Sequence, residues 1–117
     1  MSVNEAKVAA AIQVLEHPTG GFVIRIGLDA MLELMPIFEA EASYSNGPAW
    51  GALLDYLMAS DPRIADLKPD PEGLGWSATR EPLERLRAIL LEAAAEPRLL
   101  RKMIRDGRAA GFGYGDL

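Results

Sequence analysis

Side chains able to carry out catalysis are few in this chain of 117 residues. His17 is the one histidine, and it stands beside a Pro-Thr-Gly-Gly turn. A Ser-His-acid triad would therefore depend on a single loop residue, so we interpret His17 as a turn histidine in solvent. The sequence holds no cysteine, which excludes a disulfide, a thiolate nucleophile and a thiolate zinc site.

Oxygen ligands for a metal are the next possibility. Asp66, Asp70 and Glu72 lie close together in the sequence, but the pattern of an EF-hand calcium loop is missing there. Pro69 and Pro71 are typical of a turn, so we expect these acids to cap backbone groups or to face water. We predict no metal, no cofactor and no catalytic residue.

Two further patterns suggest phosphate binding but have simpler interpretations. The glycines at 111–115 resemble a nucleotide loop only superficially, because that fingerprint follows a strand and opens a helix, and these follow a predicted helix. A basic cluster near the C-terminus has the spacing of the solvated face of an amphipathic helix. Its members are Arg98, Arg101, Lys102, Arg105 and Arg108. We predict no nucleic-acid partner.

The elements that position these residues begin with a predicted β-hairpin. Residues 22–26 are rich in β-branched side chains, which favours a strand. Alternation over residues 12–16 favours a second strand before the turn, although the apolar residues of 3–16 also fit one face of a helix. The assignment of residues 8–16 as strand or helix stays open.

Two helical segments are predicted in the middle of the chain. We expect Asp29 to cap the first, which must bend at Pro36 or begin near Met35, because proline removes a backbone donor. Pro48 is favourable in the first turn of the second. Apolar residues of that helix recur at helical spacing. They are Trp50, Leu53, Leu54, Leu57 and Met58.

The C-terminal half predicts a short strand and two helices. Residues 74–78 have a strand pattern, and a helix is expected to open at Thr79 or Glu81. Pro97 restarts a second helix, for which Gly107 is the predicted C-terminal stop. The fold class is therefore α+β, with a small antiparallel sheet backed by helices in the approximate order ββαα-ββαα. We predict one domain over residues 1–107 and a flexible Gly-rich tail over residues 108–117.

Charge is unevenly distributed along the sequence. Residues 1–62 carry two bases against eight acids, a net charge of −6, whereas residues 63–117 carry ten bases against nine acids, a net charge of +1. An acidic half disfavours nucleic-acid binding and suits a basic protein partner. The alternative is that acidity simply maintains solubility. Polar residues interrupt the first twenty positions, and no apolar run reaches the length of a membrane span, so we expect a cytoplasmic protein.

Two turn-forming clusters each place a tryptophan at the start of a predicted element. One reads Tyr44-Ser45-Asn46-Gly47-Pro48-Ala49-Trp50, and the other reads Asp70-Pro71-Glu72-Gly73-Leu74-Gly75-Trp76. The chain resembles, from about Phe22 to Gly107, the immunity protein 51 family of bacterial polymorphic toxin systems. Members of that family typically show an aromatic-x-Gly-Asn-Gly-aromatic-x-Trp segment, a helix, an Asp-Pro-Glu-Ala turn into an aromatic strand, and two final helices.

This resemblance implies a protein that occludes a toxin, without a cofactor or catalytic residues. Pro48 stands where members usually have an aromatic residue, and Ala49 where they usually have an acid. The missing acid implies a different toxin or the use of Asp55 from the next turn. The resemblance does not name the toxin.

Our leading hypothesis is an immunity protein that binds a cognate toxin, expected to be a basic effector domain. Trp50 is interpreted as core, whereas Trp76 fits core or surface, and the loop at Tyr44 fits a recognition patch or a plain turn. The predicted partner-binding residues are Tyr44, Asn46, Asp55, Asp70 and Glu72.

One alternative is a small-ligand-binding or regulatory domain with a pocket between sheet and helices near Trp76. A third hypothesis is a hydrolase or other enzyme. The sequence does not indicate the oligomeric state.

Overall fold

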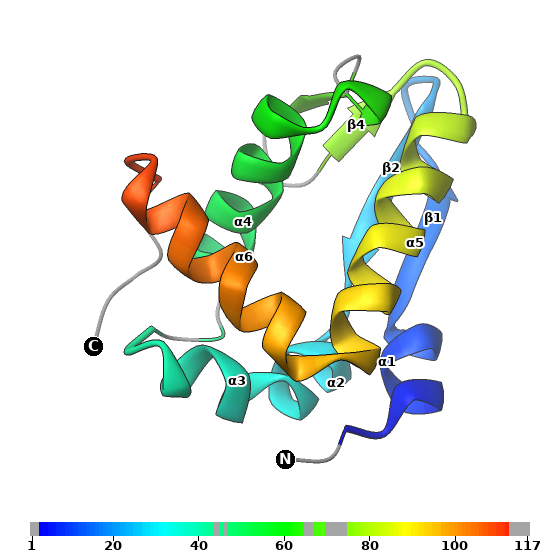
Figure 1. Cartoon of the computed structure of the whole chain (residues 1–117). Coiled ribbons are helices and arrows are strands. Elements are labelled where there is room, and N and C mark those ends of the chain that lie inside the picture. The colour runs from blue at the N-terminus through cyan, green and yellow to red at the C-terminus, as the bar shows by residue number, and fades with distance from the viewer. Residues whose placement is uncertain (1–2, 44, 46, 65–66, 70–74, 113–117) are drawn as a thin grey trace.

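The computed structural model describes residues 3–43, 45, 47–64, 67–69 and 75–112. The predicted α+β class is confirmed, with a small antiparallel sheet covered by helices (Figure 1). Strand order in the sheet is β1-β2-β4-β3, and each neighbouring pair is antiparallel. The strands are β1 (Ile12–Glu16), β2 (Phe22–Ile26), β3 (Lys68–Pro69) and β4 (Gly75–Ser77).

The ambiguous N-terminal segment contains both of the elements that its pattern allowed. Helix α1 (Glu5–Ala11) begins after Asn4, whose side chain accepts a hydrogen bond from the Lys7 N–H, and strand β1 follows directly. Arg87 holds this junction: its Nε donates to the Ile12 carbonyl at 2.7 Å, and its Nη2 donates to the Ala9 carbonyl at 2.8 Å. The change from helix to strand therefore leaves carbonyl oxygens that a distant side chain satisfies.

Pro36 divides the next helical segment as expected. Helix α2 (Leu28–Glu33) is followed by α3 (Met35–Ala40), which has Pro36 in its first turn. The prediction that Asp29 caps the helix is wrong. Gly27 occupies the cap position, and its carbonyl accepts from the Ala30 and Met31 N–H groups, so the helix begins too early for Asp29 to lie before it.

Three longer helices complete the architecture. They are α4 (Gly47–Ser60), α5 (Glu81–Ala95) and α6 (Pro97–Ala109), and a 3₁₀ turn η1 (Pro62–Ile64) follows α4. Helix α5 packs along β1, β2 and β4, whereas α6 crosses to α3 and α4 (Figure 1). The apolar stripe of α5 is buried, as are Leu100 and Ile104 of α6. The residues of that stripe are Leu83, Leu86, Ile89, Leu90 and Ala93.

Gly107 does not end the last helix, contrary to prediction. It is buried within α6, and the stop comes at Gly111, whose φ is +96°. The Gly111 N–H bonds the Arg108 carbonyl and the Phe112 N–H bonds the Gly107 carbonyl, each at 3.0 Å, which is the Schellman pattern. Phe112 then contacts Tyr56 of α4 with ring centroids 5.8 Å apart, so the ordered structure extends past residue 107.

Candidate functional site

Most of the predicted partner-binding residues lie outside the described residues. These are Tyr44, Asn46, Asp70 and Glu72. Asp55 is described, and it is exposed on α4. Partial burial among its neighbours raises the pKa of Asp55 above its ordinary value. The structure therefore places one predicted contact residue on an open helix face.

Ser45, in the loop for which the sequence allowed a recognition patch or a plain turn, has a structural role. Its hydroxyl donates to the Met31 carbonyl at 2.6 Å and accepts from Trp50 Nε1 at 3.0 Å. Trp50 is 1% exposed and packs against Phe38 with ring centroids 5.2 Å apart, which confirms its assignment to the core. These contacts fasten the start of α4 to α2 and α3.

Trp76, which the sequence left between core and surface, is half-buried and braces the hairpin turn. Its Nε1 donates to the Gly20 carbonyl at 3.1 Å. A Cβ at Gly21 would lie 2.7 Å from the Trp76 ring, and Gly21 has a φ of +77°, so glycine is required there. Trp76 thus supports the β1–β2 connection.

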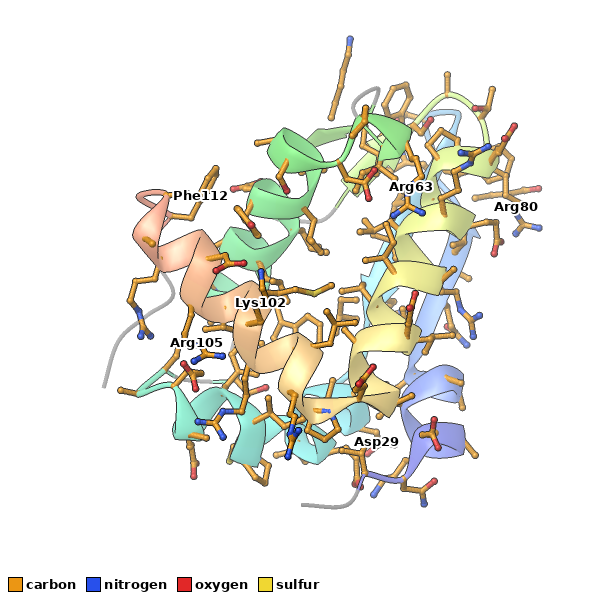
Figure 2. All side chains as sticks on the ribbon, viewed as in Figure 1. Asp29, Arg63, Arg80, Lys102, Arg105 and Phe112 are labelled. Carbon is orange, nitrogen blue, oxygen red and sulfur yellow. The ribbon has the colours of Figure 1, made fainter. Side chains whose placement is uncertain are left out.

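A groove of about 590 Å³ lies between α4, η1, α5 and α6. Its apolar surface includes Leu57, Ile89 and Met103. Charged side chains also line it, among them Arg63 of η1 and Lys102 of α6 (Figure 2). Trp76 is not among its lining residues, so this groove differs in place from the pocket that the sequence suggested.

The basic side chains of the groove each have an acidic partner close in sequence. Arg63 bonds Asp61 through Nε and Nη2, the shorter contact being 2.6 Å, and these bonds lower the pKa of Asp61. Lys102 Nζ lies 2.6 Å from Asp106, which raises the pKa of Lys102. A charged ligand in the groove would have to compete with these pairs.

A second surface carries exposed apolar and acidic side chains. We call it the α2–α3 ridge, and its residues are Leu28, Asp29, Leu32, Glu33, Pro36 and Glu39. Leu28 is 69% exposed and Leu32 is 51% exposed. Among the described residues, Leu15 is the only other large hydrophobic side chain that is exposed. Spacing of four places Leu28 and Leu32 on one face of α2. The ridge therefore presents apolar and acidic groups together.

Bases of the C-terminal half reach into the N-terminal half but not to the ridge acids. Glu41, with a side chain 7% exposed, lies 2.8 Å from Arg101 Nε and 3.3 Å from Arg105 Nε. Arg80 donates to the Val14 carbonyl at 3.2 Å. Within the part of the chain that the structure describes, no base pairs with Asp29 or Glu39.

The ridge was not among the sites predicted from the sequence. Leu34 and Phe38, on the inner face of this segment, are buried, and Met31 is partly buried. Leu28 and Leu32 are four residues apart, but this spacing fits a buried stripe equally well, so it does not by itself indicate exposure.

Comparisons with known proteins give no relative on which to base a function. No protein-family model, no curated protein and no solved structure matches the chain. Across the described residues, no group of three or more acidic, histidine or cysteine side chains has an arrangement able to hold a metal ion. No helix in the same residues has both the length and the apolar character needed to cross a membrane.

Proposed function

We propose that this protein is an immunity protein, which binds a cognate toxin domain in the cytoplasm and neutralises it by occlusion without catalysis. The resemblance at Tyr44–Trp50 and Asp70–Trp76 supports this proposal, and the distribution of charge gives it a physical basis.

The observation that carries the proposal is an acidic segment that contains no base of its own. Between Ile26 and Pro62 the sequence has six acids and no lysine or arginine. Glu41 and Asp61 are paired with arginines, whereas Asp29, Glu39 and Asp55 are exposed on α2, α3 and α4. Exposed acids attract a basic partner over distances of about 10 Å at moderate salt and accelerate encounter.

Occlusion requires no chemistry from this chain. A small domain that covers a toxin's active site or substrate path inhibits the fraction of toxin that it binds, and complementary charge mainly raises the association rate. The partner expected on this basis is a basic effector domain.

The test is protection of cells from the effector domain encoded beside this gene. Co-expression with this protein should restore growth, and the purified pair should bind with an affinity that falls as salt rises. Equal killing with and without this protein, together with no binding by calorimetry, overturns the proposal.

One observation favours a second function, binding of a small ligand. The volume of the groove falls within the range of about 300–1,000 Å³ that ligand sites occupy. A thermal-shift screen with metabolites distinguishes the two functions. Strong stabilisation by a small molecule, lost when Met103 is changed to Asp, favours the ligand.

A further inference from the structure

We propose that the α2–α3 ridge is the docking surface for a basic amphipathic helix of the partner protein. This inference rests on the proposed function for the identity of the partner, but the chemistry of the surface is defined by the ridge itself. The occupant carries apolar side chains along its centre and lysine or arginine on its flanks.

Apolar exposure is the first argument. Single exposed leucines are common on protein surfaces. Here Leu28 and Leu32 follow each other at a spacing of four, and the exposed Pro36 continues the same spacing into α3. A strip with this spacing matches the apolar stripe of a second helix laid along it.

A rigid foundation is the second argument. The opposite face of the two short helices is fully buried through Ala30, Leu34 and Phe38. Met31 is held through its carbonyl by Ser45, and Glu33 Oε1 accepts from the Asn4 N–H at 2.8 Å. A partner therefore meets a surface that is already ordered, which lowers the entropic cost of binding.

Charge selects the partner. Asp29, Glu33 and Glu39 border the apolar strip, and α2 and α3 contain no base. Arg101 and Arg105, on the neighbouring α6, both point to Glu41. The ridge consequently repels an acidic helix and attracts a basic one.

The end of the ridge at Leu28 opens onto a hollow of about 300 Å³. Ala10, Ala11 and Leu28 supply its apolar wall, and Arg25 and Asp29 supply charges of both signs. Figure 2 shows Asp29 at the end of the molecule where α1 and α2 meet, away from Arg63 and Lys102 of the groove. This hollow gives an apolar anchor of the partner helix a place to insert.

The experiment uses two synthetic peptides and the full chain. One is an amphipathic helix of leucine and lysine, and the other has glutamate at every lysine position. In ¹H–¹⁵N spectra, the lysine peptide should shift the amide signals of α2 and α3, whereas the glutamate peptide should not. Leu28→Gln with Leu32→Gln, which removes apolar surface without changing charge, should weaken lysine-peptide binding by at least about tenfold.

Matched variants control for folding. Leu28→Ala with Leu32→Ala should weaken binding in the same direction while the thermal melt stays cooperative, and Leu15→Ala, on β1, should leave peptide affinity unchanged. If the amide signals that shift belong only to groove residues, or if both peptides bind equally, the proposal that the ridge is the docking surface is overturned.

The same variants separate this inference from the proposed function. If the effector domain binds the wild type and the double variant equally, the ridge is not the docking surface, whereas the proposed immunity function is retained. If the lysine peptide docks on the ridge but the effector domain does not bind at all, the function fails and the ridge loses its stated partner. A wild-type dimer that the double variant converts to a monomer makes the occupant a second copy, which also overturns the inference.

Discussion

The groove and the α2–α3 ridge both mix apolar side chains with charge, but they differ in how the charges are compensated. Around the groove, Arg63 bonds Asp61 and Lys102 bonds Asp106 at 2.6 Å. On the ridge, Asp29 and Glu39 have no basic partner among the described residues. The bases Arg63 and Lys102 of the groove are each paired with an acid, whereas Asp29 and Glu39 of the ridge are exposed without such a pair in the described part of the chain. Concavity alone is therefore a poor guide to where this molecule would bind a charged protein.

The largest expected effect comes from removing the side chain on which both regions depend. Trp50→Ala should destabilise the protein by about 3–5 kcal/mol, because it leaves a cavity beside Phe38 and removes the bond to Ser45. Urea unfolding measures the change. Trp50→Phe keeps most of the packing and should cost less, and a loss below about 1 kcal/mol for Trp50→Ala would contradict the assignment to the core.

Next in size is the carboxylate that draws α6 onto α3. Glu41→Ala should lower the free energy of unfolding by about 1–2 kcal/mol, since two charge-assisted contacts disappear and the half-exposed arginines regain only water. Glu39→Ala, two residues away and exposed, is the matched control and should change it by less than about 0.5 kcal/mol. Equal effects of both changes would show that the contacts of Glu41 with Arg101 and Arg105 add no measurable stability.

Charge reversal on the ridge should alter kinetics more than stability. Asp29→Lys with Glu39→Lys should slow association with a basic partner by about tenfold at low salt, and by less at high salt. Stopped-flow mixing with the leucine–lysine peptide measures the rate. Glu81→Lys with Glu84→Lys on α5 is the control, because it changes the net charge by the same amount away from the ridge. If this pair slows association equally, the slowing is due to net charge alone.

The smallest effects concern two aspartates with pKa shifts of opposite sign. The lowered pKa of Asp61 means that its ionised form stabilises the fold above the ordinary aspartate pKa, and that this contribution is lost as pH falls through the lower folded value. The raised pKa of Asp55 means that its ionised form is slightly destabilising near neutrality, a penalty that disappears in acid. Asp61→Asn should therefore lower the urea midpoint at pH 7, and Asp55→Asn should raise it. Changes of the same sign would contradict one assignment.

Local patterns predicted the long elements well. Helices α5 and α6 combine a strong apolar stripe with a proline in the first turn, and these signals need no tertiary information. The segment at 3–16 fitted two patterns because it contains two elements in succession, with the change at Ile12. The contacts at that boundary come from residues further along the chain, such as Arg87 and the strand partner Ile26.

The errors have equally specific causes. Gly107 resembles a stop, but it is buried within α6 together with Leu100 and Ile104, and Gly111 supplies the positive φ that ends the helix. Asp29 resembles a cap, but Gly27 begins the helix earlier. The ridge was not predicted because exposure of an apolar residue depends on which face the rest of the fold covers.

Arg87 also constrains the order in which the molecule can assemble. Its two acceptor carbonyls belong to residues 75 and 78 positions earlier in the chain. The helix-to-strand corner of the hairpin is consequently incomplete until α5 has been synthesised and has docked, and contacts of such long range slow folding. A fragment ending at Pro62 would lack the hydrogen bonds from Arg87. We therefore expect the isolated acidic half not to keep the native junction between α1 and β1.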